Sequence, residues 1–201
     1  MVKRQKEKQY QSAIEHRQNS QIRSGSASSN SSVQRKLPFH CCALTLTPFR
    51  NPVCTSQGII FDNSALMEFL FKHKKDPVTG KTLTTRDVIT LQMDKDEEGR
   101  WQCPVLTKPF ANHTKIVAVV DQSTKEGYVY SHEAYKELNQ KTKNWFDLTT
   151  GRKFNPKKDV LILNDPQNED FQKQRDIQRF WHILNSRLVE QKRTQSSNVR
   201  H

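Results

Sequence analysis

The fold of this chain is decided by the stretch Cys42-Ala-Leu-Thr-Leu-Thr-Pro-Phe-Arg-Asn51, which returns 61 residues later as Cys103-Pro-Val-Leu-Thr-Lys-Pro-Phe-Ala-Asn112. The two stretches share cysteine, proline, phenylalanine and asparagine at identical spacing. Three further segments recur in the same order: 58–62 as 127–131, 80–83 as 151–154, and 87–91 as 159–163. Several matches in register indicate an internal duplication, in which loops lengthened between preserved elements.

Each copy predicts a small α+β unit. A loop with apolar anchors leads into a short strand at Pro52-Val53, Gly58 permits a hairpin turn, and residues 59–61 form the returning strand. A helix follows, with capping residues at its start and apolar residues at spacings of three and four. The turn 76–80 ends it, because proline blocks helix continuation and glycine permits positive φ. The helix positions are Asp62, Asn63 or Ser64 as cap and Leu66, Phe69 and Leu70 as apolar face in the first copy, and Ser131 as cap with Ala134, Tyr135 and Leu138 in the second.

The chain therefore divides into four segments. Residues 1–36 form a Lys/Arg/Gln-rich and then Ser/Asn-rich arm that we expect to be disordered, because it cannot bury enough apolar surface. Residues 37–101 form the first unit, residues 102–167 form the second, and residues 168–201 form a tail. The tail carries a helical stripe; we expect it either to pack on the second unit or to bind a partner. The stripe consists of Ile177, Phe180, Trp181, Leu184 and Leu188.

The net charge of +12 is unevenly distributed. The arm contributes +6, with eight Lys/Arg against two acidic residues, whereas residues 37–167 contribute only +3, with eighteen against fifteen. A basic arm of this kind suits RNA, acidic protein surfaces or nuclear import. The balanced middle of the chain does not predict a dedicated nucleic-acid reader.

The four cysteines do not predict a metal site. No C-x2-C pair occurs, and no H-x3–5-H pair accompanies the cysteines. We expect Cys41, Cys42, Cys54 and Cys103 to behave as small core hydrophobes, and the fold to need neither zinc nor another cofactor. No apolar run approaches the roughly 20 residues of a membrane span, and the N-terminus lacks the apolar region of a secretory signal. We therefore expect a soluble, intracellular protein without a membrane partner.

The order of these elements, with Cys-Pro at the start of the second copy and no zinc ligands, resembles the U-box, a RING-like fold in which polar and salt-bridge contacts replace the metals. Longer motifs resemble the N-terminal region of the U-box cyclophilins. These motifs are Leu37-Pro-Phe39, Pro52-Val-Cys-Thr55, Gly58-Ile-Ile-Phe-Asp62, Cys103-Pro-Val-Leu106, Ile116-Val-Ala-Val119, 141–148 and Asn164-Asp-Pro166, with Lys3-Arg-Gln5 and Phe180-Trp-His182 in the flanks. The resemblance implies two tandem U-box units. Because those proteins continue into a cyclophilin domain that this chain does not reach, we expect no prolyl isomerase activity.

The resemblance also implies a site. U-boxes use no side-chain nucleophile, so we expect no catalytic residue; they hold a ubiquitin-conjugating enzyme in a reactive pose, and catalysis comes from positioning. We predict that Leu44 on loop one, Phe69 on the helix and Pro77 on loop two form the docking groove, with Lys81 as a candidate basic contact. Leu46 and Pro48 are assigned to the structure of the loop. The alternative is that Leu44, Phe69 and Pro77 fill a small core. With Leu138 and Leu148 at the matching positions, the second unit resembles a degenerate site.

Three functions remain open. The first is a ubiquitin ligase acting through the first unit. The second is a non-catalytic component of the spliceosome or another nuclear ribonucleoprotein assembly, because the U-box cyclophilins resemble known spliceosomal components. The third is direct RNA binding by the basic arm, although the folded part lacks interleaved aromatic and basic residues. Each of the first two implies a nuclear protein.

Overall fold

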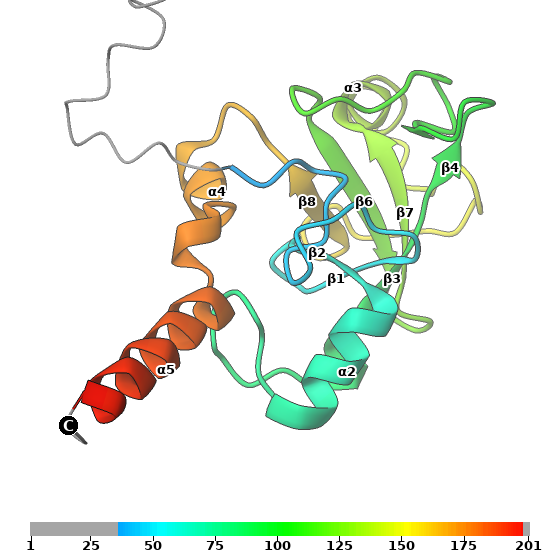
Figure 1. Ribbon diagram of the computed structural model, residues 1–201. Coiled ribbons are helices and arrows are strands. Elements are labelled where there is room, and N and C mark those ends of the chain that lie inside the picture. Colours follow the sequence, from blue (N-terminus) through cyan, green and yellow to red (C-terminus); the bar gives the residue numbers. More distant parts are fainter. Residues whose placement is uncertain (1–35, 199–201) are drawn as a thin grey trace, which may run out of the picture. The chain divides into compact units, whose positions relative to one another are not determined.

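The computed structural model describes residues 36–198, so the predicted arm lies outside the described residues except for Lys36. The predicted mixed α+β class is confirmed. A six-stranded sheet has the order β2-β1-β3-β7-β6-β8, and four α-helices, α2 to α5, lie within the described part of the chain (Figure 1). No helix among these residues is long and apolar enough to cross a membrane.

The first unit supplies one half of the sheet and a long helix. Strand β1 pairs antiparallel with both β2 and β3, so the local order is β2-β1-β3. The side chain of Asp62 caps α2 by accepting from the Ser64 N–H, as the sequence predicts, and Leu66 and Leu70 are the buried face of the helix. The elements are β1 (Pro52–Cys54), β2 (Ile60–Asp62), α2 (Asn63–His73), a 3-10 turn (Thr85–Asp87) and β3 (Ile89–Gln92).

The second unit repeats this order. Strand β6 pairs antiparallel with both β7 and β8, which gives β7-β6-β8. The two halves meet where β3 and β7 pair in parallel, and the small β4–β5 hairpin lies between the units in sequence. One continuous sheet therefore joins both units. The elements are β4 (Asp94–Lys95), β5 (Trp101–Gln102), β6 (Ile116–Asp121), β7 (Glu126–Ser131), α3 (His132–Tyr135), the π-turn η2 (Lys136–Gln140) and β8 (Val160–Asn164).

The helix of the second unit departs from the predicted register. Its first turn, α3, is capped by Ser131 and buries Ala134 and Tyr135, as expected. The chain then widens into a π-turn, which shifts the following side chains around the axis. As a result Asn139 points inward and donates to the carbonyls of Asn144 and Phe146, while Leu138 is 40% exposed. The prediction that Leu138 shares the buried face is wrong.

The tail packs against both units. It contains α4 (Glu169–Gln174), a 3-10 turn (Ile177–Arg179) and α5 (Trp181–Asn198). Arg175 is buried and donates to the carbonyls of Leu37 and Pro38, at the start of the first unit, and to that of Leu163 in β8. The start of α5 lies on the first unit, whereas Arg175 before it reaches β8 of the second unit, so the alternative in which the tail packs on the second unit holds only in part.

The core extends through both units. The most deeply buried large side chains include Phe61 and Leu66 from the first unit, Tyr130 and Ile116 from the second, and Phe180 from the tail. All four cysteines are free and buried, as predicted for small core residues. Gly58 is required at its turn, because its φ is +78° and a Cβ there would lie 1.9 Å from the Ile162 carbonyl oxygen in β8.

Candidate protein-docking site

Loop one is organised around Cys42. The Cys42 N–H donates to the Thr47 carbonyl at 2.8 Å, and the Leu46 N–H donates to the Cys42 carbonyl at 2.9 Å. The buried thiol Sγ also accepts from the N–H groups of Leu44 and Thr45 at 3.4 and 3.5 Å. These contacts close the loop and leave Leu44 half-buried at its outer side.

Leu46 adds apolar surface to the same loop. Its φ of 60° lies in the left-handed region, and its side chain is 38% exposed. Pro48 is also exposed. The sequence assigned both residues to loop structure, because alternation alone cannot tell an exposed leucine in a tight loop from a buried one.

Loop two is organised around Asp76, which is buried. Its carboxylate accepts from the Val78 N–H at 2.8 Å and from the Thr79 hydroxyl at 2.9 Å. Its main-chain N–H donates to the Lys81 carbonyl at 2.8 Å, and its carbonyl accepts from the Gly80 N–H at 2.9 Å. Short-range hydrogen bonds to a charged acceptor therefore fix the shape of the loop. The Lys81 side chain is exposed.

Asp147 does the same in the second unit, 71 residues later. It accepts from the Thr150 N–H at 2.8 Å and the Thr150 hydroxyl at 2.7 Å, and its own carbonyl accepts from Gly151 at 2.9 Å. Loop one repeats as well, since the Cys103 N–H donates to Lys108 and the Thr107 N–H donates to Cys103. The hydrogen bonds of both loops are thus repeated at the offsets found in the sequence.

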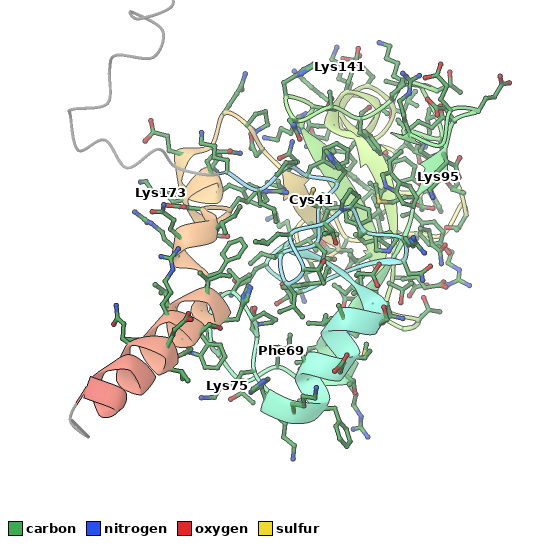
Figure 2. The ribbon with its side chains drawn as sticks, viewed as in Figure 1. Cys41, Phe69, Lys75, Lys95, Lys141 and Lys173 are labelled. Atoms are coloured by element: carbon green, nitrogen blue, oxygen red, sulfur yellow. The ribbon has the colours of Figure 1, made fainter. Side chains whose placement is uncertain are left out.

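Phe69 lies on the side of α2 that faces loop two and α5 (Figure 2). It is half-buried, whereas Leu66 and Leu70 of the same helix are 0% and 3% exposed. Its ring lies 4.4 Å from that of His73 and 6.4 Å, edge-to-face, from that of Trp181. Phe69 is therefore a peripheral contact residue and not part of the central core.

The first turn of α5 lies on loop two. The N–H of Trp181 donates to the Val78 carbonyl and that of His182 donates to the Pro77 carbonyl, both at 2.9 Å. The indole of Trp181 lies so close to Gly80 that a Cβ there would be 2.4 Å from its Cδ1 atom. Pro77 is fully buried in this arrangement. We refer to Trp181 and His182 together as the α5 plug.

His182 connects the two loops. Its Nδ1 lies 3.0 Å from the Pro77 carbonyl oxygen, which fits an N–H donor at that nitrogen. The other ring nitrogen, Nε2, is buried and makes no hydrogen bond within the described residues. Burial lowers the pKa of His182, against the opposing influence of the Pro77 and Leu44 backbone groups. The ring is therefore neutral in its docked position near pH 7.

Three of the four predicted site residues therefore lie around the α5 plug. Phe69 contacts Trp181, Pro77 bonds His182, and the backbone of Leu44 influences the His182 ring. Lys81 is exposed on the same loop as Pro77. The fully buried Pro77 does not fit the expectation of an open groove. The sequence could not reveal this, since the predicted stripe of residues 177–188 says only that one face of a helix is apolar. The stripe is also not one helix: Phe180 is extended, between the 3-10 turn and α5.

The matching surface of the second unit is uncovered. Leu138 and Phe146 are 40% and 49% exposed, and Val105 and Leu148 are half-buried. Loop two is fastened there by Tyr130, whose hydroxyl donates to Asp147 at 2.8 Å and accepts from the Thr149 N–H at 3.1 Å. The corresponding residue of the first unit is Phe61, which has no hydroxyl.

No group of three or more His, Cys, Asp or Glu residues that could hold a metal ion occurs in residues 36–198. Burial raises the pKa of Cys41 and Cys54, which favours their neutral thiols. Neither of these two thiols is therefore activated as a nucleophile.

In both units a helix follows a β-hairpin and lies between two hydrogen-bonded loops. The chain belongs to the Rtf2 RING-finger family, whose family model matches residues 2–199.

Several curated proteins are similar to this chain. Peptidyl-prolyl cis-trans isomerase-like 2 of Rhizopus delemar is 37% identical over 82% of this chain and 30% of its own length. Peptidyl-prolyl cis-trans isomerase 4 of Caenorhabditis elegans is 41% identical over 74% of the chain and 27% of its own length. Peptidyl-prolyl cis-trans isomerase CYP65 of Arabidopsis thaliana is 43% identical over 68% and 22%, respectively. The chain thus spans less than a third of the length of these relatives.

Proposed function

We propose that the chain contains two tandem U-box units of the kind found in the U-box cyclophilins, and that the first is a ubiquitin-ligase module that docks a ubiquitin-conjugating enzyme. The observation that carries the proposal is that Leu44, Phe69 and Pro77 each lie next to Trp181 or His182, with Leu44 and Pro77 on loops that hydrogen bonds hold in shape. Membership of a RING-finger family supports it. The module supplies no nucleophile and acts by holding the charged enzyme in a reactive geometry.

The individual roles follow from exposure. Leu44 and Leu46 supply the apolar side of loop one, Phe69 supplies an aromatic edge from α2, and Lys81 offers a cation beside loop two. Pro77 reaches a partner only after the α5 plug leaves. Truncation of a central interface anchor commonly costs 2 kcal/mol or more, or about 30-fold in affinity.

The test is discharge of ubiquitin from a panel of charged conjugating enzymes. The full chain should promote discharge, and Leu44→Ala should reduce it about 30-fold. The matched control is Val105→Ala, which changes the equivalent position in the second unit and should leave discharge unchanged. Equal loss in both variants would contradict a site in the first unit, and an undiminished rate in Leu44→Ala would refute the assignment of loop one.

A second candidate function is a non-catalytic docking module of a nuclear assembly such as the spliceosome. The observation that favours it is the burial of Pro77 together with exposed apolar side chains elsewhere, Leu138 and Phe146 in the second unit and Leu184 and Leu188 on α5. If a folded Trp181→Ala chain discharges ubiquitin from no conjugating enzyme of the panel, that result would favour this function. Association of the full chain with isolated nuclear ribonucleoprotein complexes, and its loss in Phe146→Ser, would then test it.

A further inference from the structure

The first turn of α5 packs on loop two of the first unit. Trp181 and His182 each donate a main-chain N–H to loop two, and Phe180 just before them is fully buried. Leu184, Leu188 and Val189 are 45%, 53% and 52% exposed. In Figure 1, α5 meets the loop that follows α2 at its beginning and extends away from it.

The contact between the α5 plug and the first unit is small and lies at the periphery of the core. Trp181 is only half-buried, its ring meets Phe69 edge-on at 6.4 Å, and the exposed Lys75 lies with its Nζ 5.3 Å from the indole centroid. Figure 2 marks Phe69 and Lys75 at this place, between α2 and the start of α5. The buried Nε2 of His182 makes no hydrogen bond of ordinary geometry to another described residue, and the Leu44 backbone is the second polar group that acts on the ring, beside that of Pro77. Such a contact can open locally while the sheet remains folded.

The plug also covers the surface that a partner would need. The carbonyls of Pro77 and Val78 accept hydrogen bonds from the main chain of the plug, and Gly80 lies against the Trp181 indole ring. His182 lies beside both Leu44 on loop one and Pro77 on loop two. A partner that inserts between the two loops must therefore occupy the volume of these two side chains.

We infer that the α5 plug is a displaceable, self-inhibiting ligand of the docking surface, so that the first unit binds the plug or a ubiquitin-conjugating enzyme but not both. This inference rests on the proposed function for the identity of the competing partner, and on the described contacts for the plug itself. Only the fraction of molecules with the plug released is competent, and the apparent affinity for the partner falls by that fraction.

The experiment uses the full chain and two measurements. The first is the dissociation constant for a conjugating enzyme with the wild type, Trp181→Ala and His182→Ala. Both variants should bind about tenfold more tightly than the wild type. The matched control, Val189→Ala, changes another exposed residue of the same helix and should bind as the wild type does. Circular dichroism and thermal unfolding establish that each variant is folded.

The second measurement uses a fluorescein-labelled peptide of residues 177–191. It should bind the full-length Trp181→Ala variant, bind the wild type at least tenfold more weakly, and be displaced by the conjugating enzyme. The corresponding peptide with Trp181→Ala should not bind.

The outcomes separate the two proposals. If the peptide binds the opened variant but no conjugating enzyme binds any variant, the plug is displaceable and the ubiquitin function fails. If the enzyme binds wild type and opened variants equally, and the peptide does not bind, the plug is a fixed part of the fold and the inference is overturned. If both variants that open the plug fail to fold, the plug is likewise a core element and the inference is overturned.

Discussion

Removal of the Asp76 carboxylate should weaken the first unit severely. In Asp76→Ala, the Val78 N–H and the Thr79 hydroxyl lose acceptors at 2.8 and 2.9 Å, at a place where Asp76 and Val78 are only 4% and 8% exposed. A hydrogen bond to a charged group contributes about 1.5–3 kcal/mol, and the buried Val78 N–H has little access to water as a replacement. We expect the free energy of unfolding to fall by about 3–4 kcal/mol.

The assay is urea denaturation followed by tryptophan fluorescence and circular dichroism, with the shift in midpoint converted through the slope. Asp147→Ala, the repeat-related change in the second unit, should cost a similar amount. Asp87→Ala is the matched control, because Asp87 accepts two hydrogen bonds from Thr84 in an exposed turn and should contribute under about 1 kcal/mol. A loss below about 1 kcal/mol in Asp76→Ala would refute the claim that this carboxylate holds loop two.

Three further predictions concern other parts of the fold. Arg175→Met should lower the free energy of unfolding by about 3 kcal/mol, measured by urea denaturation, because three carbonyl groups lose a buried cationic donor. Burial already lowers the pKa of Arg175 to about 10. A loss below about 1 kcal/mol would contradict this prediction. Docking of α5 should weaken as pH falls below 6.5, because burial lowers the pKa of His182 in the docked state and protonation therefore favours release. A pH titration of Trp181 fluorescence should show this release. His182→Gln should abolish the pH response. Prolonged treatment with a chelator should leave the thermal midpoint unchanged; a drop would reveal a structural metal.

Local signals made part of the fold predictable. Strand β1 and the start of α2 follow from short-range patterns, and Asp62 acts as the cap that its position before the helix indicates. The internal repeat could also be found in the sequence. The structure agrees with it, because Asp76 and Asp147, 71 residues apart, accept similar hydrogen bonds in their loops. These features need only neighbouring residues, so the chain itself encodes them.

Long-range features were not predictable in the same way. The parallel pairing of β3 with β7 has no local signature, since it joins the two units through segments that each resemble an ordinary short strand. The π-turn that exposes Leu138 and buries Asn139 is a different case: Asn139 donates to carbonyls only five and seven residues further on, at Asn144 and Phe146, and a regular 3.6-residue period does not reveal such a turn.

The candidate site shows the same division. Leu44, Phe69 and Pro77 could be selected from a single unit, but the contact between His182 and Pro77 spans 105 residues. An apolar helical stripe indicates that one face is buried and not which surface buries it. Sequence patterns therefore do not tell whether another segment of the chain covers the site.

The most direct test of the proposed docking site is ubiquitin discharge by the Trp181→Ala chain compared with the Trp181→Ala/Leu44→Ala double variant. The opened chain should discharge faster than the wild type, and the double variant should lose that gain and fall below the wild-type rate. A folded Trp181→Ala chain that fails to discharge any charged conjugating enzyme would contradict the ligase function. Equal discharge by the opened chain and the double variant would contradict the placement of the site at loop one.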